Sequence, residues 1–126
     1  MINLSLEQLL EIHALVLQET GGSAGLRDLG RLEAALATQT QVVFGEELYA
    51  TPCEKAAALI RGIIADHAFV DGNKRSGMLA GLTFLSINGV VFKAKQGELE
   101  DLAVQVATNH LTVTDIAAWL AERVEQ

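Results

Sequence analysis

A short segment near the middle of the chain concentrates side chains that bind phosphate or move protons. Residues 67–75 read HAFVDGNKR, so a histidine, an aspartate, an asparagine, a lysine and an arginine lie close together. The chain as a whole is acidic, with 9 Lys and Arg against 16 Asp and Glu and a net charge of −7. Two adjacent basic residues shortly after a glycine are therefore a local feature, and they indicate a candidate site for an anionic ligand.

A helix that starts near Asn73 would make this segment a phosphate site. The first N–H groups of a helix lack intrahelical partners, and the helix dipole places positive charge at the same end. Gly72 lets the backbone approach a phosphate closely. Lys74 and Arg75 add full positive charge, and the planar guanidinium suits phosphate oxygens. The sequence thus predicts a phosphate cradle at this helix start.

Asp71 and His67 could supply chemistry beside this cradle. One carboxylate together with substrate phosphates commonly holds Mg²⁺, and an imidazole can take a proton from an attacking hydroxyl near neutral pH. Taken singly, each feature has a simpler explanation: a turn and helix cap at 71–73, a solvated first turn for the two cations, and a structural histidine. Their combination favours a site, with Phe69 as a core residue that anchors the loop.

Two strongly apolar segments flank the motif and are expected to position it. Pro52, suited to the first turn of a helix, opens a segment that runs to about Ile64. The second runs from about Asn73 to Ile87 and stops at the Asn-Gly pair of 88–89. Both segments are apolar on nearly every side, so we expect two buried central helices with the motif in the loop between them.

Amphipathic periodicity and capping residues predict four further helices. Their expected ranges are Ser5 to about Gly21, Asp28 to Leu36, Glu98 to His110, and Thr112 to Val124 with a capping box. Residues 41–45 could form a short strand or a loop, and 90–92 a short strand or a connector. The sequence therefore predicts an all-α fold, a single domain of about six helices over residues 1–126.

The remaining composition narrows the function classes. A net charge of −7 argues against direct nucleic-acid binding. The N-terminus lacks the features of a secretory signal, and the most apolar tract, 78–92, is shorter than the roughly 20 residues of a membrane span.

Cys53 is the only cysteine and is expected in the core or at a helix start, which fits a reducing cytoplasm. His13 lies on the apolar face of the first helix, where a structural role is expected, and we leave it outside the site.

The string HAFVDGNKR resembles the signature of the Fic/Doc (Fido) superfamily, written roughly as His-Pro-Phe-x-(Asp/Glu)-Gly-Asn-Gly-Arg. The resemblance is to the variant with lysine before the arginine that is found in the death-on-curing toxin branch. The resemblance extends from the stretch at 21–28, which contains Gly-Gly-x-x-Gly-Leu-Arg-Asp, through Phe-Gly at 44–45 and residues 54–57 to the C-terminal helices.

This resemblance implies a helical toxin that uses ATP and Mg²⁺ to modify a hydroxyl of a cellular protein and that has a separate antitoxin chain. Elongation factor Tu is the reference substrate of the family. The implied roles are His67 as general base, Asp71 as metal ligand, Gly72 and Asn73 as phosphate nest, and the cations at 74 and 75 as phosphate clamps.

The sequence departs from the AMP-transferring members of this superfamily at three positions. Lys74 replaces a glycine, Met78 stands where a second arginine is expected, and Ala68 replaces proline. The resemblance implies that members with this lysine present the γ-phosphate and act as protein kinases. Transfer of AMP or another nucleotide, and a non-catalytic binding module, are the alternatives. No Ser or Thr is followed four residues later by Glu, so inhibition is expected from another chain.

Overall fold

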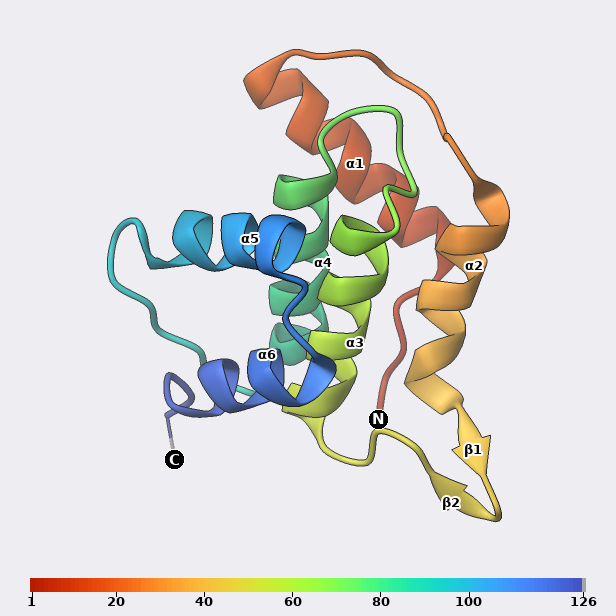
Figure 1. Cartoon of the computed structure of the whole chain (residues 1–126), viewed down its shortest axis with the longest axis vertical. Helices are drawn as coiled ribbons and strands as arrows, with labels where there is room; N and C mark the ends of the chain where they lie inside the picture. The colour runs from red at the N-terminus through yellow and green to blue at the C-terminus, as the bar shows by residue number, and fades with distance from the viewer. Residues whose placement is uncertain (126) are drawn as a thin grey trace.

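The computed structural model describes residues 1–125, and within them it confirms the predicted all-α class. Six α-helices and one short 3-10 helix account for most of this part of the chain, and the only sheet there is a two-stranded hairpin (Figure 1). The helices are α1 Leu6–Thr20, α2 Leu29–Ala37, α3 Pro52–Ala65, α4 Asn73–Ile87, α5 Glu98–Asn109 and α6 Val113–Ala121; the 3-10 helix is Thr38–Thr40, and the strands are β1 Val42–Val43 and β2 Glu46–Glu47.

Helices α3 and α4 form the centre of the molecule, as their apolar sequences predicted. They lie side by side because two glycines of α4 allow a close approach. A Cβ on Gly77 would come within 2.6 Å of Ile64, and one on Gly81 within 2.5 Å of Ile60. Both isoleucines are fully buried. The loop that joins the two helices is therefore held between two rigid, tightly packed ends.

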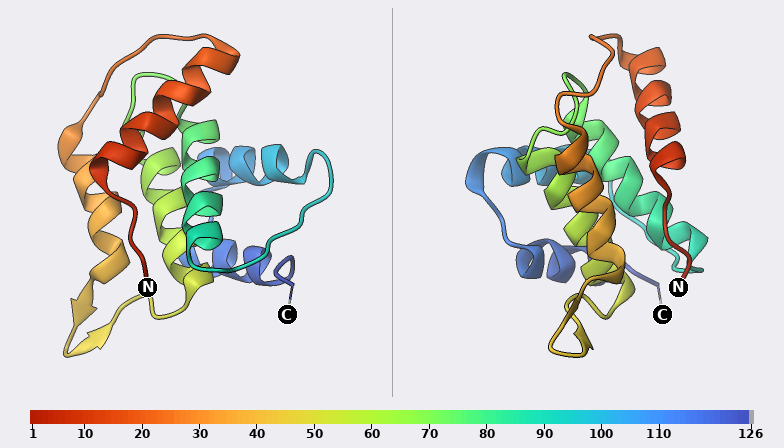
Figure 2. Two further views of the ribbon diagram at one scale, coloured as in Figure 1. Left: turned by 180° about the vertical axis from the view of Figure 1, so that it is seen from behind. Right: turned by 90° about the vertical axis from the view of Figure 1, so that its right-hand side faces the viewer.

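The other four helices surround this pair. Helix α2 packs on α3, where a Cβ on Gly62 would lie 2.8 Å from Ala35. Helix α1 packs on α4, α5 contacts α3 and α4, and α6 packs on α3. Figure 2 shows α1 and α2 on one side of the central pair and α5 and α6 on the other. The core contains the buried faces of all six helices.

Capping residues set several helix bounds where the sequence placed them. Ser5 and Thr112 form capping boxes, while Asp28 and Thr51 accept a hydrogen bond from the backbone of the first turn. Gly72 starts α4 with a φ of 77°, in the left-handed region that glycine tolerates. The start of the motif helix therefore depends on this glycine.

Three segments differ from the prediction or settle an open alternative. Residues 41–45 contribute β1, which pairs antiparallel with β2, so the strand alternative is correct. The last helix ends at Ala121, three residues before the predicted Val124, because Val124 instead forms an isolated bridge with Phe92. The segment 90–92 is a connector with this single bridge.

Among the described helices, none has the length and apolar character that a membrane crossing requires.

Candidate functional site

The motif covers the loop 66–72 and the first turn of α4, at the end of the molecule opposite the β1–β2 hairpin (Figure 1). Helix α3 ends before Asp66, and His67 follows with a φ of 49°. A residue with a side chain adopts this left-handed conformation at a cost of about 1–3 kcal/mol, which the surrounding structure must offset. His67 is exposed, so the imidazole is available to a ligand or substrate.

The segment 21–28, between α1 and α2, runs alongside the motif loop. The backbone N–H groups of Arg27 and Asp28 donate to the carbonyl of Ala68 at 3.0 and 3.2 Å. The N–H of Val70 donates to the carbonyl of Gly25 at 3.1 Å, and Leu26 forms a β-bridge with Phe69. These contacts join residues 40 or more positions apart in the chain, and they fix the path of the loop.

The side chain of Asn73 fixes the loop from the other end. Its Oδ1 accepts from the N–H of Phe69, and its Nδ2 donates to the carbonyl of the same residue, both at 2.9 Å. Both polar groups of the amide are thus used on the backbone of the loop. The main-chain N–H of Asn73 is the group at this position that can face a phosphate, because it precedes the first intrahelical bond, from Ser76 to Gly72.

Phe69 is the predicted anchor, and the structure confirms its burial at 1% exposure. Its ring stacks on His13 with 3.8 Å between ring centroids and 6° between the planes. His13 is itself buried, and its Nε2 lies 2.8 Å from the carbonyl oxygen of Asp71. Helix α1 therefore touches the motif through a residue that the sequence analysis left outside the site.

The carboxylate of Asp71 is oriented by two backbone N–H groups. Gly72 donates to Oδ1 at 2.9 Å and Ser23 donates to Oδ2 at 3.3 Å. Gly22 lies against it: a Cβ there would be 2.6 Å from Oδ2. Each oxygen keeps lone-pair capacity beyond one such bond, so this carboxylate can still bind a cation.

A cavity of about 450 Å³ brings the predicted site residues together. Its lining includes all six of them: His67, Asp71, Gly72, Asn73, Lys74 and Arg75. Lys74 and Arg75 are exposed and form no ion pair within residues 1–125. The cavity therefore offers two cations, the N-terminus of α4, one carboxylate and one imidazole, which suits a phosphate ester.

Comparison with known proteins identifies the family. Residues 3–85 match the Fic/DOC family. This chain belongs to the Fic/DOC family. A protein named Toxin Doc from Mycolicibacterium smegmatis is 44% identical over 103 residues, which cover 80% of this chain and 79% of that protein. Protein kinase doc of Escherichia phage P1 is 36% identical over 121 residues, which cover 93% and 91% of the two chains.

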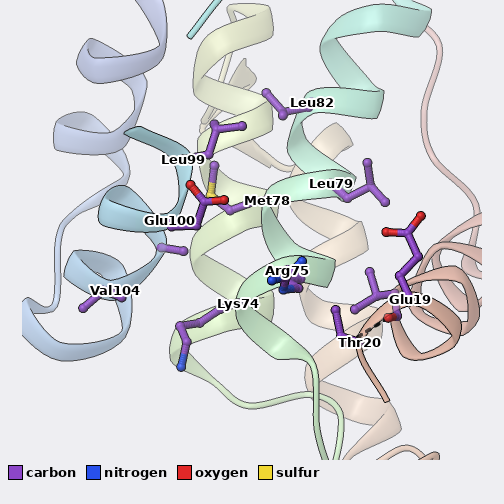
Figure 3. Close-up of a pocket in the computed structure, with 12 residues that line it drawn as sticks. Glu19, Thr20, Lys74, Arg75, Met78, Leu79, Leu82, Leu99, Glu100 and Val104 are labelled. Carbon is purple, nitrogen blue, oxygen red and sulfur yellow. Dashed lines mark hydrogen bonds between the residues drawn. The ribbon is translucent and has the colours of Figure 1, made fainter. Parts of the chain in front are cut away.

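Two residues of this Fic/DOC protein that depart from the AMP-transferring members, Lys74 and Met78, lie in different environments. Lys74 stands in the exposed first turn of α4, where it lines the cavity. Met78 is 6% exposed and lies one turn further along. It lines a second, mostly apolar hollow of about 400 Å³ between α1, α4 and α5. Figure 3 shows this hollow with Lys74 and Arg75 near one end and Leu82 and Leu99 near the other.

The cavity of this Fic/DOC protein offers one carboxylate to a metal ion. Within residues 1–125, no three side chains of His, Cys, Asp or Glu are placed to hold a metal together. Asp71 is the carboxylate that lines the cavity. This arrangement fits Mg²⁺, which commonly binds through one carboxylate plus phosphate oxygens and water.

Proposed function

We propose that this protein is the toxin component of a toxin–antitoxin system and that it transfers the γ-phosphate of ATP to a Ser or Thr hydroxyl of a cellular protein. The observation that carries the proposal is the cavity at the start of α4, in which Lys74 and Arg75 stand beside Asp71 and His67. The relatives named Toxin Doc and Protein kinase doc support both parts.

The roles of the cavity residues follow from their chemistry. His67 takes the proton of the attacking Ser or Thr hydroxyl. The hydroxyl oxygen bonds to the γ-phosphorus, and ADP leaves with the bridging oxygen. Lys74, Arg75 and the N–H groups of the first turn of α4 bind phosphate oxygens. Asp71 would hold Mg²⁺ against the phosphates, where the ion neutralises their charge. Phosphoryl transfer needs mainly such positioning and charge neutralisation.

The choice of γ-phosphate over nucleotide depends on Lys74. A lysine side chain occupies space that a glycine would leave for phosphate against bare backbone, and it places a cation in the first turn. Met78 supplies no second cation one turn later. Both features favour phosphoryl transfer over AMP transfer, which is the alternative outcome of the test below.

The proposal extends to the setting of the reaction. A separate antitoxin chain is the expected inhibitor, in line with the toxin name of one relative. The proposed substrate is a translation protein such as elongation factor Tu. Residues 1–126 are proposed to act as one domain. The reaction is proposed to take place in the cytoplasm.

Labelled ATP separates the alternatives. The protein is incubated with a cell extract and ATP labelled at either the γ- or the α-phosphate. We expect γ-label on a protein band, a rate lower by about 10²–10⁴-fold in His67→Ala, and an unchanged rate in His110→Ala, whose histidine is exposed. Transfer of α-label alone would establish nucleotidyl transfer. No transfer of either label, with His67→Ala as toxic as the parent, would establish a non-catalytic module.

A further inference from the structure

His13 is a buried polar residue of α1 that none of the proposed catalytic steps uses. It is 6% exposed, and its ring stacks on Phe69 while its Nε2 lies 2.8 Å from the carbonyl oxygen of Asp71. A carbonyl oxygen only accepts, so Nε2 must carry the hydrogen and donate. The contact joins residues 58 positions apart in the chain, and it ends on the residue proposed to hold the metal.

The peptide unit between Asp71 and Gly72 is bonded on both sides. Its carbonyl accepts from His13 at 2.8 Å, and its N–H donates to Oδ1 of Asp71 at 2.9 Å. The orientation of this peptide plane therefore contributes to the direction of the carboxylate, together with the N–H of Ser23 on Oδ2. It also sets the start of α4, because the next carbonyl, that of Gly72, accepts the first hydrogen bond of the helix, from Ser76.

This peptide is also the one in the loop that can most easily turn over. Rotation of a peptide plane changes ψ of the residue before it and φ of the residue after it. Gly72, at φ 77°, accepts positive and negative values of φ at little cost. Reversal would point the N–H away from Oδ1 and leave the carboxylate with the hydrogen bond from Ser23 alone. A donor fixed on the carbonyl opposes the reversal, and His13 is that donor.

We propose that His13 is a positioning residue that locks the Asp71–Gly72 peptide and thereby aims the Asp71 carboxylate into the cavity. The inference rests on the proposed function for its catalytic consequence, but its structural content stands independently. The stack on Phe69 holds the imidazole in place, and the hydrogen bond transmits that position to Asp71.

Two substitutions separate the hydrogen bond from the packing. His13→Phe keeps a flat ring against Phe69 but removes the donor. His13→Gln keeps a donor, since the Nε2 of glutamine can reach the position of the imidazole Nε2. Ile12 is a buried neighbour on the same helix. Ile12→Val loosens the packing of α1 and keeps the imidazole of His13, so it serves as the stability control.

The first readout is the Gly72 amide in ¹H–¹⁵N spectra of the ligand-free protein. In His13→Phe we expect its resonance to move upfield and its hydrogen exchange to quicken by about tenfold, as for the loss of one hydrogen bond. We expect both to stay near the parent values in His13→Gln and Ile12→Val. An unchanged Gly72 amide in His13→Phe would overturn the inference, whether or not the protein proves to be a kinase.

The second readout is phosphoryl transfer at temperatures where all variants are folded. We expect kcat of His13→Phe to fall by about 10- to 100-fold, the effect of a misplaced catalytic group, and His13→Gln to recover most of it. Equal losses in His13→Phe and Ile12→Val would reduce His13 to a packing residue and overturn the inference. If the parent transfers no label, the proposed function fails and the amide readout still decides the inference.

Discussion

The substitution Gly22→Ala places a methyl group where the Asp71 carboxylate now lies. The new Cβ would be 2.6 Å from Oδ2 and 3.2 Å from Cγ, whereas ordinary contact begins at 3.4 Å. The carboxylate would have to move by about 0.8 Å, the difference between 3.4 and 2.6 Å. It cannot move freely, because the N–H of Gly72 holds Oδ1 at 2.9 Å and Ser23 donates to Oδ2.

A displacement of this size predicts a large kinetic effect. A misplacement of about 1 Å at a catalytic group costs on the order of 100-fold in rate, so we expect phosphoryl transfer by Gly22→Ala to fall by roughly 30- to 100-fold. The backbone contributes separately, because an alanine at the φ of 114° found at Gly22 is strained by about 1–3 kcal/mol. The free energy of unfolding should fall by that amount.

Gly89→Ala is the matched control for this experiment. Gly89 also has a positive φ, 76°, but a Cβ there meets nothing within 4 Å, and the residue follows the far end of α4. The Gly89→Ala variant should have a lower free energy of unfolding because of backbone strain, and it should transfer phosphate at the parent rate. Rates are measured with γ-labelled ATP over a range of Mg²⁺ concentrations, and stability by urea unfolding. If Gly22→Ala transferred phosphate as fast as Gly89→Ala, the carboxylate position would not matter, and the role given to Asp71 would be wrong.

Three further predictions test other parts of the structure. Gly81→Ala should lower the free energy of unfolding by about 1–2 kcal/mol in urea melts, because overpacking against α3 outweighs the gain in helix propensity; higher stability would contradict the close approach. Asn73→Ala removes both hydrogen bonds to the backbone of Phe69. Phosphoryl transfer should therefore be lost, and thermal unfolding should show about 2 kcal/mol less stability. A stable, active variant would show that these two hydrogen bonds do not hold the loop. A hydrogen bond from Arg123 lowers the pKa of Glu98; this contribution is present above about pH 4.3 and is lost as pH falls through the lowered value. The urea midpoints of the parent and of Glu98→Gln should therefore differ at neutral pH and converge in acid. If the difference between the two midpoints did not change with pH, the ion pair would not be its cause.

Local sequence signals predicted the elements that carry the site. Pro52 predicted the start of α3, and apolar periodicity with the Asn-Gly stop predicted the range of α4. The six predicted site residues were expected together because they are close in the chain, and all six line one cavity. These predictions succeeded because each depends on interactions within a few residues of sequence.

The contacts that brace the motif could not be predicted in this way. The backbone bonds between 21–28 and the loop, and the bond from His13 to Asp71, join segments 40 or more positions apart. Periodicity carries no information on such pairs. One signal was available for His13: it shares the buried face of α1 with Leu9 and Val16, and a buried polar side chain requires a hydrogen-bond partner.

The bracing contacts explain how an exposed loop can hold the geometry that we propose for catalysis before any substrate binds. The carbonyl of Ala68 and the N–H of Val70 bond to segment 21–28, Phe69 bonds to Asn73, and Asp71 bonds to His13. Each of these four positions is thus tied to a different part of the chain or to the start of α4. The groups left to bind phosphate, by contrast, are the exposed cations and the N–H groups of the first turn. Because the backbone that carries them is already fixed, little ordering free energy is lost on binding. It follows that a substitution in the bracing segments should lower the rate more than it weakens nucleotide binding, whereas loss of a cation should weaken binding directly.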